Sequence, residues 1–203
     1  MDIDPKDLVD NAKAAHDKAA AASEGRLNAA VAVTIAVLAT FMGICKVKDD
    51  NIVQAMQQAQ ADKLDHWAYY QARNIRQQMA ESSATQLELA RAGASAAAVA
   101  GYDAAIAKYH ALAEDQAKKK EDLKQQAEGD QKKYDDLNFR DDQFDLSDAL
   151  IAIAIAMLAV TALTGLWPLF WAALLPTVTG MMMGFAGLTA LPWHPDALIK
   201  LLS

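Results

Sequence analysis

Histidine and cysteine, the side chains that most often do chemistry, are few in this chain and poorly spaced for it. The sequence holds four histidines and one cysteine. His66 follows Asp65, but neighbouring residues on a helix do not share a face, so this pair does not chelate a metal. His110 and Glu114 are four residues apart and can share a face, yet two ligands are too few for a metal site. Each histidine is therefore expected to be structural or solvated.

Cys45 and the glycines offer no catalytic pattern either. A single cysteine forms no disulfide within its own chain and no thiolate metal site. No H-E-x-x-H motif, phosphate-cradling glycine loop or nucleophile elbow stands out. The sequence therefore predicts no catalytic residue, no cofactor-binding residue and no metal site, and a protein that is not an enzyme.

The densest run of unusual residues is H-W-A-Y-Y-Q-A-R-N-I-R, at positions 66–76. On a helix, Trp67 and Tyr70 lie on one face, and Tyr69 and Arg73 on the adjoining one. Aromatic and arginine residues together are typical anchors of protein interfaces. Two interpretations stay open, packing within the chain and contact between subunits. The predicted interaction residues are Trp67, Tyr69, Tyr70, Gln71, Arg73, Ile75 and Arg76.

Charge is segregated along the chain. Of its 203 residues 53% are hydrophobic and 22% are charged, yet positions 27–45 and 149–191 contain no Asp, Glu, Lys or Arg. A charge at the bilayer centre costs about 2.5–3.5 kcal/mol, so charge-free stretches of this length indicate membrane spans. The net charge of −7 gives a nucleic acid no basic surface to bind. We expect an integral membrane protein that contacts membrane lipid and no nucleic acid.

Three transmembrane helices are predicted, at residues 26–46, 148–167 and 168–192. The first contains a charge-free run close to the ~20 residues that cross a bilayer core. Small residues spaced four apart let such helices approach closely. The predicted packing positions in the second and third spans are Ala152, Ala156, Gly180, Gly184 and Gly187.

The rest of the chain is also predicted to be helical, which makes the fold class all-α. Residues 47–147 read as a long antiparallel helical hairpin outside the membrane, coiled-coil-like, with its tip near 93–101. Residues 1–25 are expected to form an alanine-rich helix, and residues 193–203 a short tail. Alanine and glutamine fill many hairpin positions, and alanine buries little apolar area. We expect neighbouring copies or another protein to cover the hairpin; the alternative is a solvated hairpin whose base the membrane clamps.

The run at 66–76 resembles the signature of a bacterial membrane family called domain of unknown function four-three-three-seven, W-[AS]-[FY]-Y-Q-[AS]-[KR]-x-I-[KR]. The layout is similar too, with one span, a long helical section and two tightly joined spans between about Leu27 and Leu191. The resemblance implies this topology and a bacterial source, and it implies no activity. The matching positions, which would be signature rather than catalytic residues, are Trp67, Tyr70, Gln71, Arg73, Ile75 and Arg76.

These patterns favour a structural or assembly protein that self-associates, or binds a larger membrane complex, through its hairpin and spans. The alternative is a subunit of an oligomeric channel or transporter, although the spans carry no charged group to form an ion pathway. The expected location is the bacterial inner membrane. Lysine and arginine near the span ends place the hairpin in the cytoplasm by the positive-inside rule. The residues compared are Lys46, Lys48, Arg140 and Lys200 against Lys18 and Arg26.

Overall fold

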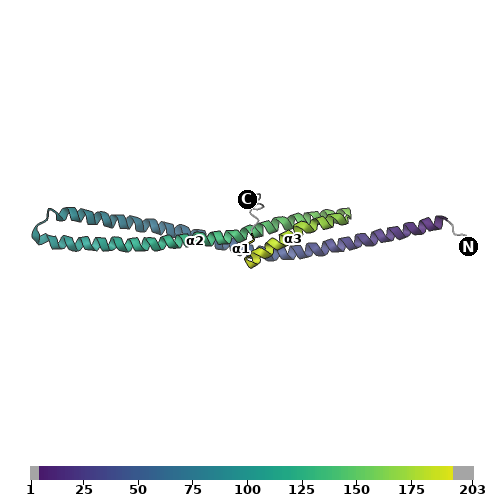
Figure 1. The fold of residues 1–203 in the computed structure, drawn as a ribbon, viewed down its shortest axis with the longest axis horizontal. Helices are drawn as coiled ribbons and strands as arrows, with labels where there is room; N and C mark the ends of the chain where they lie inside the picture. Colours follow the sequence, from purple (N-terminus) through teal and green to yellow (C-terminus); the bar gives the residue numbers. More distant parts are fainter. Residues whose placement is uncertain (1–4, 194–203) are drawn as a thin grey trace. The chain divides into compact units, whose positions relative to one another are not determined.

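The computed structural model describes the backbone of residues 5–193, and the side chains of residues 13, 15, 16, 18 and 21–193. It contains three helices, α1 (Pro5–Arg91), α2 (Ala96–Thr164) and α3 (Trp167–Thr189), and no strand over this range (Figure 1). The predicted all-α class is confirmed. The first four residues and all of the predicted tail except Trp193 lie outside the described residues.

All three helices contain a stretch long and apolar enough to cross a membrane. This is what a multi-pass membrane protein requires, because only a helix or a closed barrel satisfies the backbone within lipid. α1 continues through residue 25 and through residue 47 without a break. The predicted N-terminal helix, first span and first arm of the hairpin are therefore parts of one helix.

Glycines stand at both turns between the helices. α1 ends at Arg91, and residues 92–95 turn with hydrogen bonds from Gly93 N to the Ala90 carbonyl and from Ala94 N to the Arg91 carbonyl. This turn lies at the start of the predicted tip region, and Gly101 is already inside α2. Between α2 and α3, Gly165 has φ 68°, a left-handed value that glycine adopts without strain.

The described residues divide into two compact units. One comprises residues 1–52 with 139–203, and the other comprises residues 53–138. In the second unit, α1 and α2 run antiparallel, since contacts pair rising positions on α1 with falling positions on α2 (Figure 1). The contacts are Lys63–Gln131 at 2.7 Å, Asn74–Lys120 at 3.1 Å and Glu88–His110 at 3.0 Å.

Apart from Met56, the buried apolar residues of the unit at 53–138 have small side chains. Ala59, Ala84 and Ala127 are fully buried, with Ala80 and Ala113 nearly so. A buried methylene-sized group is worth about 0.8 kcal/mol, so each alanine contributes far less than a leucine. The two helices thus approach closely but bury little apolar surface against each other.

The other unit has a core of large side chains. Leu27 and Leu38 of α1 pack with Ile151 and Leu158 of α2 and with Phe170 of α3, and the four aliphatic residues are fully buried. At the turn between α2 and α3, Trp167 Nε1 donates a hydrogen bond to Ser23 Oγ of α1 at 3.2 Å. The three apolar helical stretches therefore pack together within this unit.

Candidate interaction surfaces

One half of the 66–76 run lies on the side of α1 that faces α2. The rings of Trp67 and Tyr70 meet edge to face, with centroids 5.2 Å apart and an interplanar angle of 73°. Lys120 of α2 stands 5.8 Å from the Tyr70 centroid. Arg73 Nη1 donates to Oε1 of the buried Gln116 at 3.0 Å. Tyr70 and Arg73 therefore contact α2, while Trp67 packs against Tyr70 within α1.

The other half of the run faces away from α2. Tyr69, Gln71, Ile75 and Arg76 are exposed, although two of them are large and apolar or aromatic. The structure thus separates the seven predicted interaction residues into an inner and an outer set. The outer set is exposed, and the inner set includes the residues that contact α2.

Both histidines singled out from the sequence pair across the two helices. His66 Nδ1 lies 2.7 Å from Asp130 Oδ2. His110 Nε2 lies 3.0 Å from Glu88 Oε1, while Glu114 pairs instead with Lys118 at 2.8 Å. Among the described residues, no group of three or more His, Cys, Asp or Glu side chains is arranged to hold a metal ion. The two histidines thus have structural partners on the facing helix.

The glycines predicted to pack the spans lie against neighbouring helices. A Cβ atom on Gly180 would meet Ile151 Cγ1 at 3.0 Å, and one on Gly187 would meet the Phe144 ring at 2.9 Å. At Gly184 it would stand 2.7 Å from Phe41 and from Ser147 Oγ. Any side chain at Gly184 would therefore require Phe41 and Ser147 to shift. Ala152 and Ala156, in contrast, are exposed on α2 and leave a small-residue face open.

Three polar side chains on α2, which were not predicted from the sequence, donate hydrogen bonds to backbone carbonyls of α3 and of the residues after it. Arg140 Nη2 donates to the Gly187 carbonyl at 2.8 Å, and Ser147 Oγ to the Gly180 carbonyl at 2.8 Å. Fully buried Gln143 donates to the carbonyls of Leu191 and Trp193 at 2.9 and 2.6 Å. Of these carbonyls, that of Gly187 is in the last turn of α3 and has no donor within the helix, while those of Leu191 and Trp193 lie beyond its end. The spacing of three and four residues on α2 was the signal available in the sequence.

Carboxyl groups gather where the first apolar stretch of α1 ends. Asp49 is only 5% exposed, and its Oδ2 accepts a hydrogen bond from Lys46 Nζ at 2.8 Å. Burial and the neighbouring carboxyls of Asp49 and Asp145 raise the pKa of Asp141 to about 7. Burial, followed by the charge of Asp49, also raises the pKa of Asp145. Protonated carboxyls at this position reduce the repulsion between α1 and α2.

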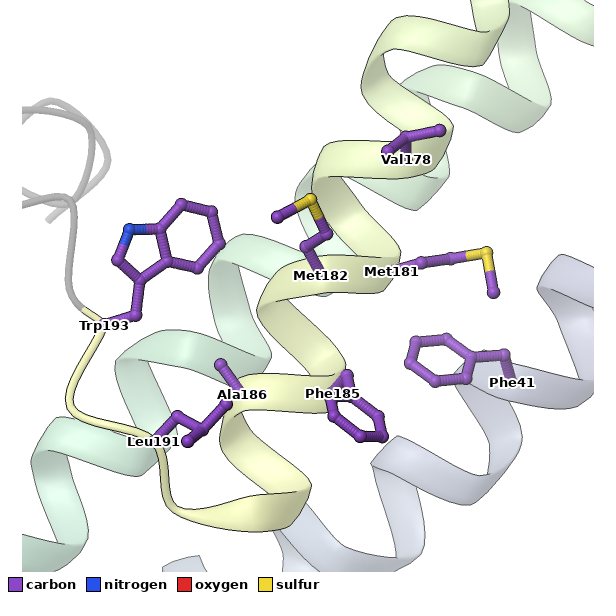
Figure 2. Close-up of a pocket in the computed structure, with 8 residues that line it drawn as sticks. All are labelled: Phe41, Val178, Met181, Met182, Phe185, Ala186, Leu191 and Trp193. Atoms are coloured by element: carbon purple, nitrogen blue, oxygen red, sulfur yellow. The ribbon is translucent and has the colours of Figure 1, made fainter.

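An apolar pocket of about 570 Å³ lies between α3 and α1 (Figure 2). Beside it, a second apolar groove of about 480 Å³ follows α1 and shares Phe41 and Met181 with the pocket. No titratable side chain lines either space, so both suit hydrocarbon chains or apolar side chains rather than a polar substrate. The pocket is lined by Phe41, Val178, Met181, Met182, Phe185, Ala186, Leu191 and Trp193.

Comparison with known proteins gives one match. The family model described as domain of unknown function (DUF4337) matches residues 27–190, which is most of the chain. No curated protein matches the chain. No solved structure matches it either. The matched range begins with the charge-free stretch of α1 and ends just past α3, so it includes all of the unit at residues 53–138 and most of the other unit.

Proposed function

The chain belongs to the DUF4337 family, and we propose that it is a non-enzymatic membrane assembly protein. In this proposal the three apolar stretches span the bacterial inner membrane. Residues 47–147 form a coiled-coil-like hairpin on the cytoplasmic side. The protein self-associates, or joins a larger membrane complex, through the hairpin and the spans.

The outward half of the 66–76 run carries this proposal. Tyr69 and Ile75 are more than half exposed in a segment that is otherwise rich in polar residues. Exposed aromatic and aliphatic side chains beside an arginine, here Arg76, match the composition of interface hot spots. Meanwhile Arg73 and Tyr70 contact Gln116 and Lys120 of α2. A rigid helix that presents such side chains is suited to binding another protein.

The alanine core of residues 53–138 supports the same function. Fully buried Ala59, Ala84 and Ala127 provide close contact but little hydrophobic stabilisation. Cross-helix polar pairs such as Lys63–Gln131 are half-buried and add little where water competes for them. Coverage by a partner adds apolar burial that this pair of helices lacks.

The test is the protein's mass together with its neighbours in cells. The chain is purified in a mild detergent, and its protein mass is measured by light scattering with the detergent contribution subtracted. In parallel, cells are treated with a short cross-linker, and captured partners are identified by mass spectrometry. We expect a mass above the 21.9 kDa of one chain, or a reproducibly captured membrane protein. A monomer without captured partners would refute the proposal.

A further inference from the structure

The face of α1 that points away from α2 carries a row of exposed apolar residues. Leu64, Ile75, Met79 and Leu89 are between 56% and 73% exposed. Buried Ala80 and Ala84 lie two residues to either side of Ser82, and two residues correspond to ~200° around a helix. Ser82 therefore lies on the face of α1 opposite the surface that packs on α2, and it marks the centre of that outer face.

Residues on this outer face follow the heptad spacing of a coiled coil. From Leu64 the steps alternate between four and three residues, and all of the positions are exposed. Alternation of four and three is the pattern by which one helix packs along another. Leu89 continues the pattern one heptad after Ser82. We call this row the outer seam; it consists of Leu64, Ala68, Gln71, Ile75, Gln78, Ser82, Thr85 and Leu89.

A hollow on the outer seam has the layout of a coiled-coil hole. It measures about 380 Å³, and four of its lining residues are Ile75, Gln78, Met79 and Ser82. They stand at positions i, i+3, i+4 and i+7, which is the set of four that receives one knob from a facing helix. In a parallel, in-register pair the knob that enters this hole is Gln78 of the other helix. The hollow is therefore shaped to receive a helix.

Charge favours a second copy as that helix. The outer seam contains no charged residue, although Asp65, Arg76 and Glu81 flank it. An uncharged seam can meet itself, because no like charges come together. Glutamine carries both a donor and an acceptor, so Gln71 and Gln78 can pair with themselves. In the parallel register Glu81 would face Gln86 of the other copy, again without repulsion.

Membrane insertion would set the direction of such a pair. α1 continues from the first apolar stretch into the outer seam as one helix. Copies inserted the same way in one membrane start this helix at the same depth and run it in the same direction. Three large apolar residues make a weak coiled coil by themselves, but confinement in a membrane raises the effective concentration of one copy near another. We propose that a second copy of this chain packs on the outer seam in parallel and in register.

Cysteine cross-linking in native membrane vesicles tests this inference, which rests on the proposed membrane assembly. Cys45 is first changed to Ala, and single cysteines are then introduced as Gln71→Cys or Gln78→Cys. The matched control is Gln126→Cys, because Gln126 is an equally exposed glutamine on α2. Disulfides form only between Cα atoms closer than ~7 Å. After mild oxidation we expect several-fold more disulfide-linked dimer at positions 71 and 78 than at 126.

Equal dimer yields at all three positions would reflect random collision and would overturn the inference. Links from position 71 only to a distant seam position, or to a different protein, would overturn it as well. If the seam cysteines do not link but the detergent mass still exceeds one chain, the inference fails while membrane assembly stands. If the mass is that of one chain and cells yield no captured partner, both fail.

Discussion

Ser147 and Gly184 hold α2 and α3 at a separation that leaves no room for a side chain. A Cβ atom on Gly184 would lie 2.7 Å from Ser147 Oγ, and the Phe41 ring closes the same space from α1. Ser147 is fully buried and donates to the Gly180 carbonyl, so it has little freedom to move away. All three helices thus meet at one glycine.

We therefore expect Gly184→Ala to destabilise the protein. Overpacking of a filled core costs about 1–3 kcal/mol. Gly43→Ala is the matched control, because nothing lies within 4 Å of a Cβ at Gly43. Alanine in place of a helical glycine should stabilise by about 0.5–1 kcal/mol there. Thermal unfolding in detergent checks both variants, and a higher midpoint for Gly184→Ala would contradict the packing.

The hydrogen bonds from Gln143 of α2 to the segment after α3 predict a second stability effect. Gln143→Ala removes the amide that bonds the Leu191 and Trp193 carbonyls and leaves both without that donor. A typical hydrogen bond contributes about 0.5–1.5 kcal/mol net, so loss of the two bonds should lower the unfolding midpoint. Gln126→Ala, on an exposed part of α2, should leave the midpoint nearly unchanged. Equal midpoints for the two variants would show that the Gln143 hydrogen bonds do not contribute to stability.

The carboxyl cluster makes stability depend on pH. The pKa of Asp141 is raised from the usual 3.8 to about 7, so the folded protein retains a proton that the unfolded chain releases. The contribution of Asp141 to stability is therefore full below pH ~4 and is lost as pH rises through 7. The pKa of Asp141 is also raised by its acidic neighbours Asp49, Asp142 and Asp145.

Asp141→Asn removes this titration. The unfolding midpoint of the variant should exceed that of the wild type by more at pH 8 than at pH 4. Glu128→Gln, an exposed acid on α2, serves as the control whose difference from wild type stays nearly constant. A wild-type advantage that grows with pH would reverse the sign and contradict the assigned pKa shift.

The two faces of the 66–76 run should separate stability from assembly. Trp67→Ala removes the edge-to-face contact with Tyr70 and should lower the unfolding midpoint; aromatic pairs contribute about 0.5–1.5 kcal/mol beyond their buried area. Tyr69→Ala, on the exposed side, should change the midpoint little. Thermal unfolding in the presence of the same detergent provides the comparison. A larger loss for Tyr69 than for Trp67 would mean that the inner and outer faces are misassigned.

The helical organisation was predictable because its signals are local. Charge-free runs mark the apolar stretches, and Gly93 and Gly165 mark the turns between helices. The run at 66–76 was identified from its composition, but its division into two faces depends on where α2 lies. Which small residues pack within the chain was not predictable either. Gly184 and Ala156 belong to similar small-residue patterns, and only the neighbouring helices distinguish them.

Long-range partners were the main omission. Glu114 is four residues from His110 and suits it on a helix, yet Glu88 bonds His110 from the facing helix. Sequence spacing does not report the competition between a partner on the same helix and one on another helix. The hydrogen bonds from Gln143 to carbonyls beyond residue 190 were not predicted for the same reason, because they join positions that are distant in the sequence.

The most direct test of assembly through α1 treats native membrane vesicles with a short cross-linker and compares the cross-linked masses of the wild type and Ile75→Glu. Ile75 is 56% exposed, so a glutamate there does not disturb the core, but it places like charges together on the outer seam. Tyr69→Glu, exposed but off the outer seam, is the control. We predict a wild-type mass of at least twice the 21.9 kDa chain, retained by Tyr69→Glu and reduced by Ile75→Glu. A wild-type monomer, or an Ile75→Glu mass equal to that of the wild type, would contradict assembly through the outer seam of α1.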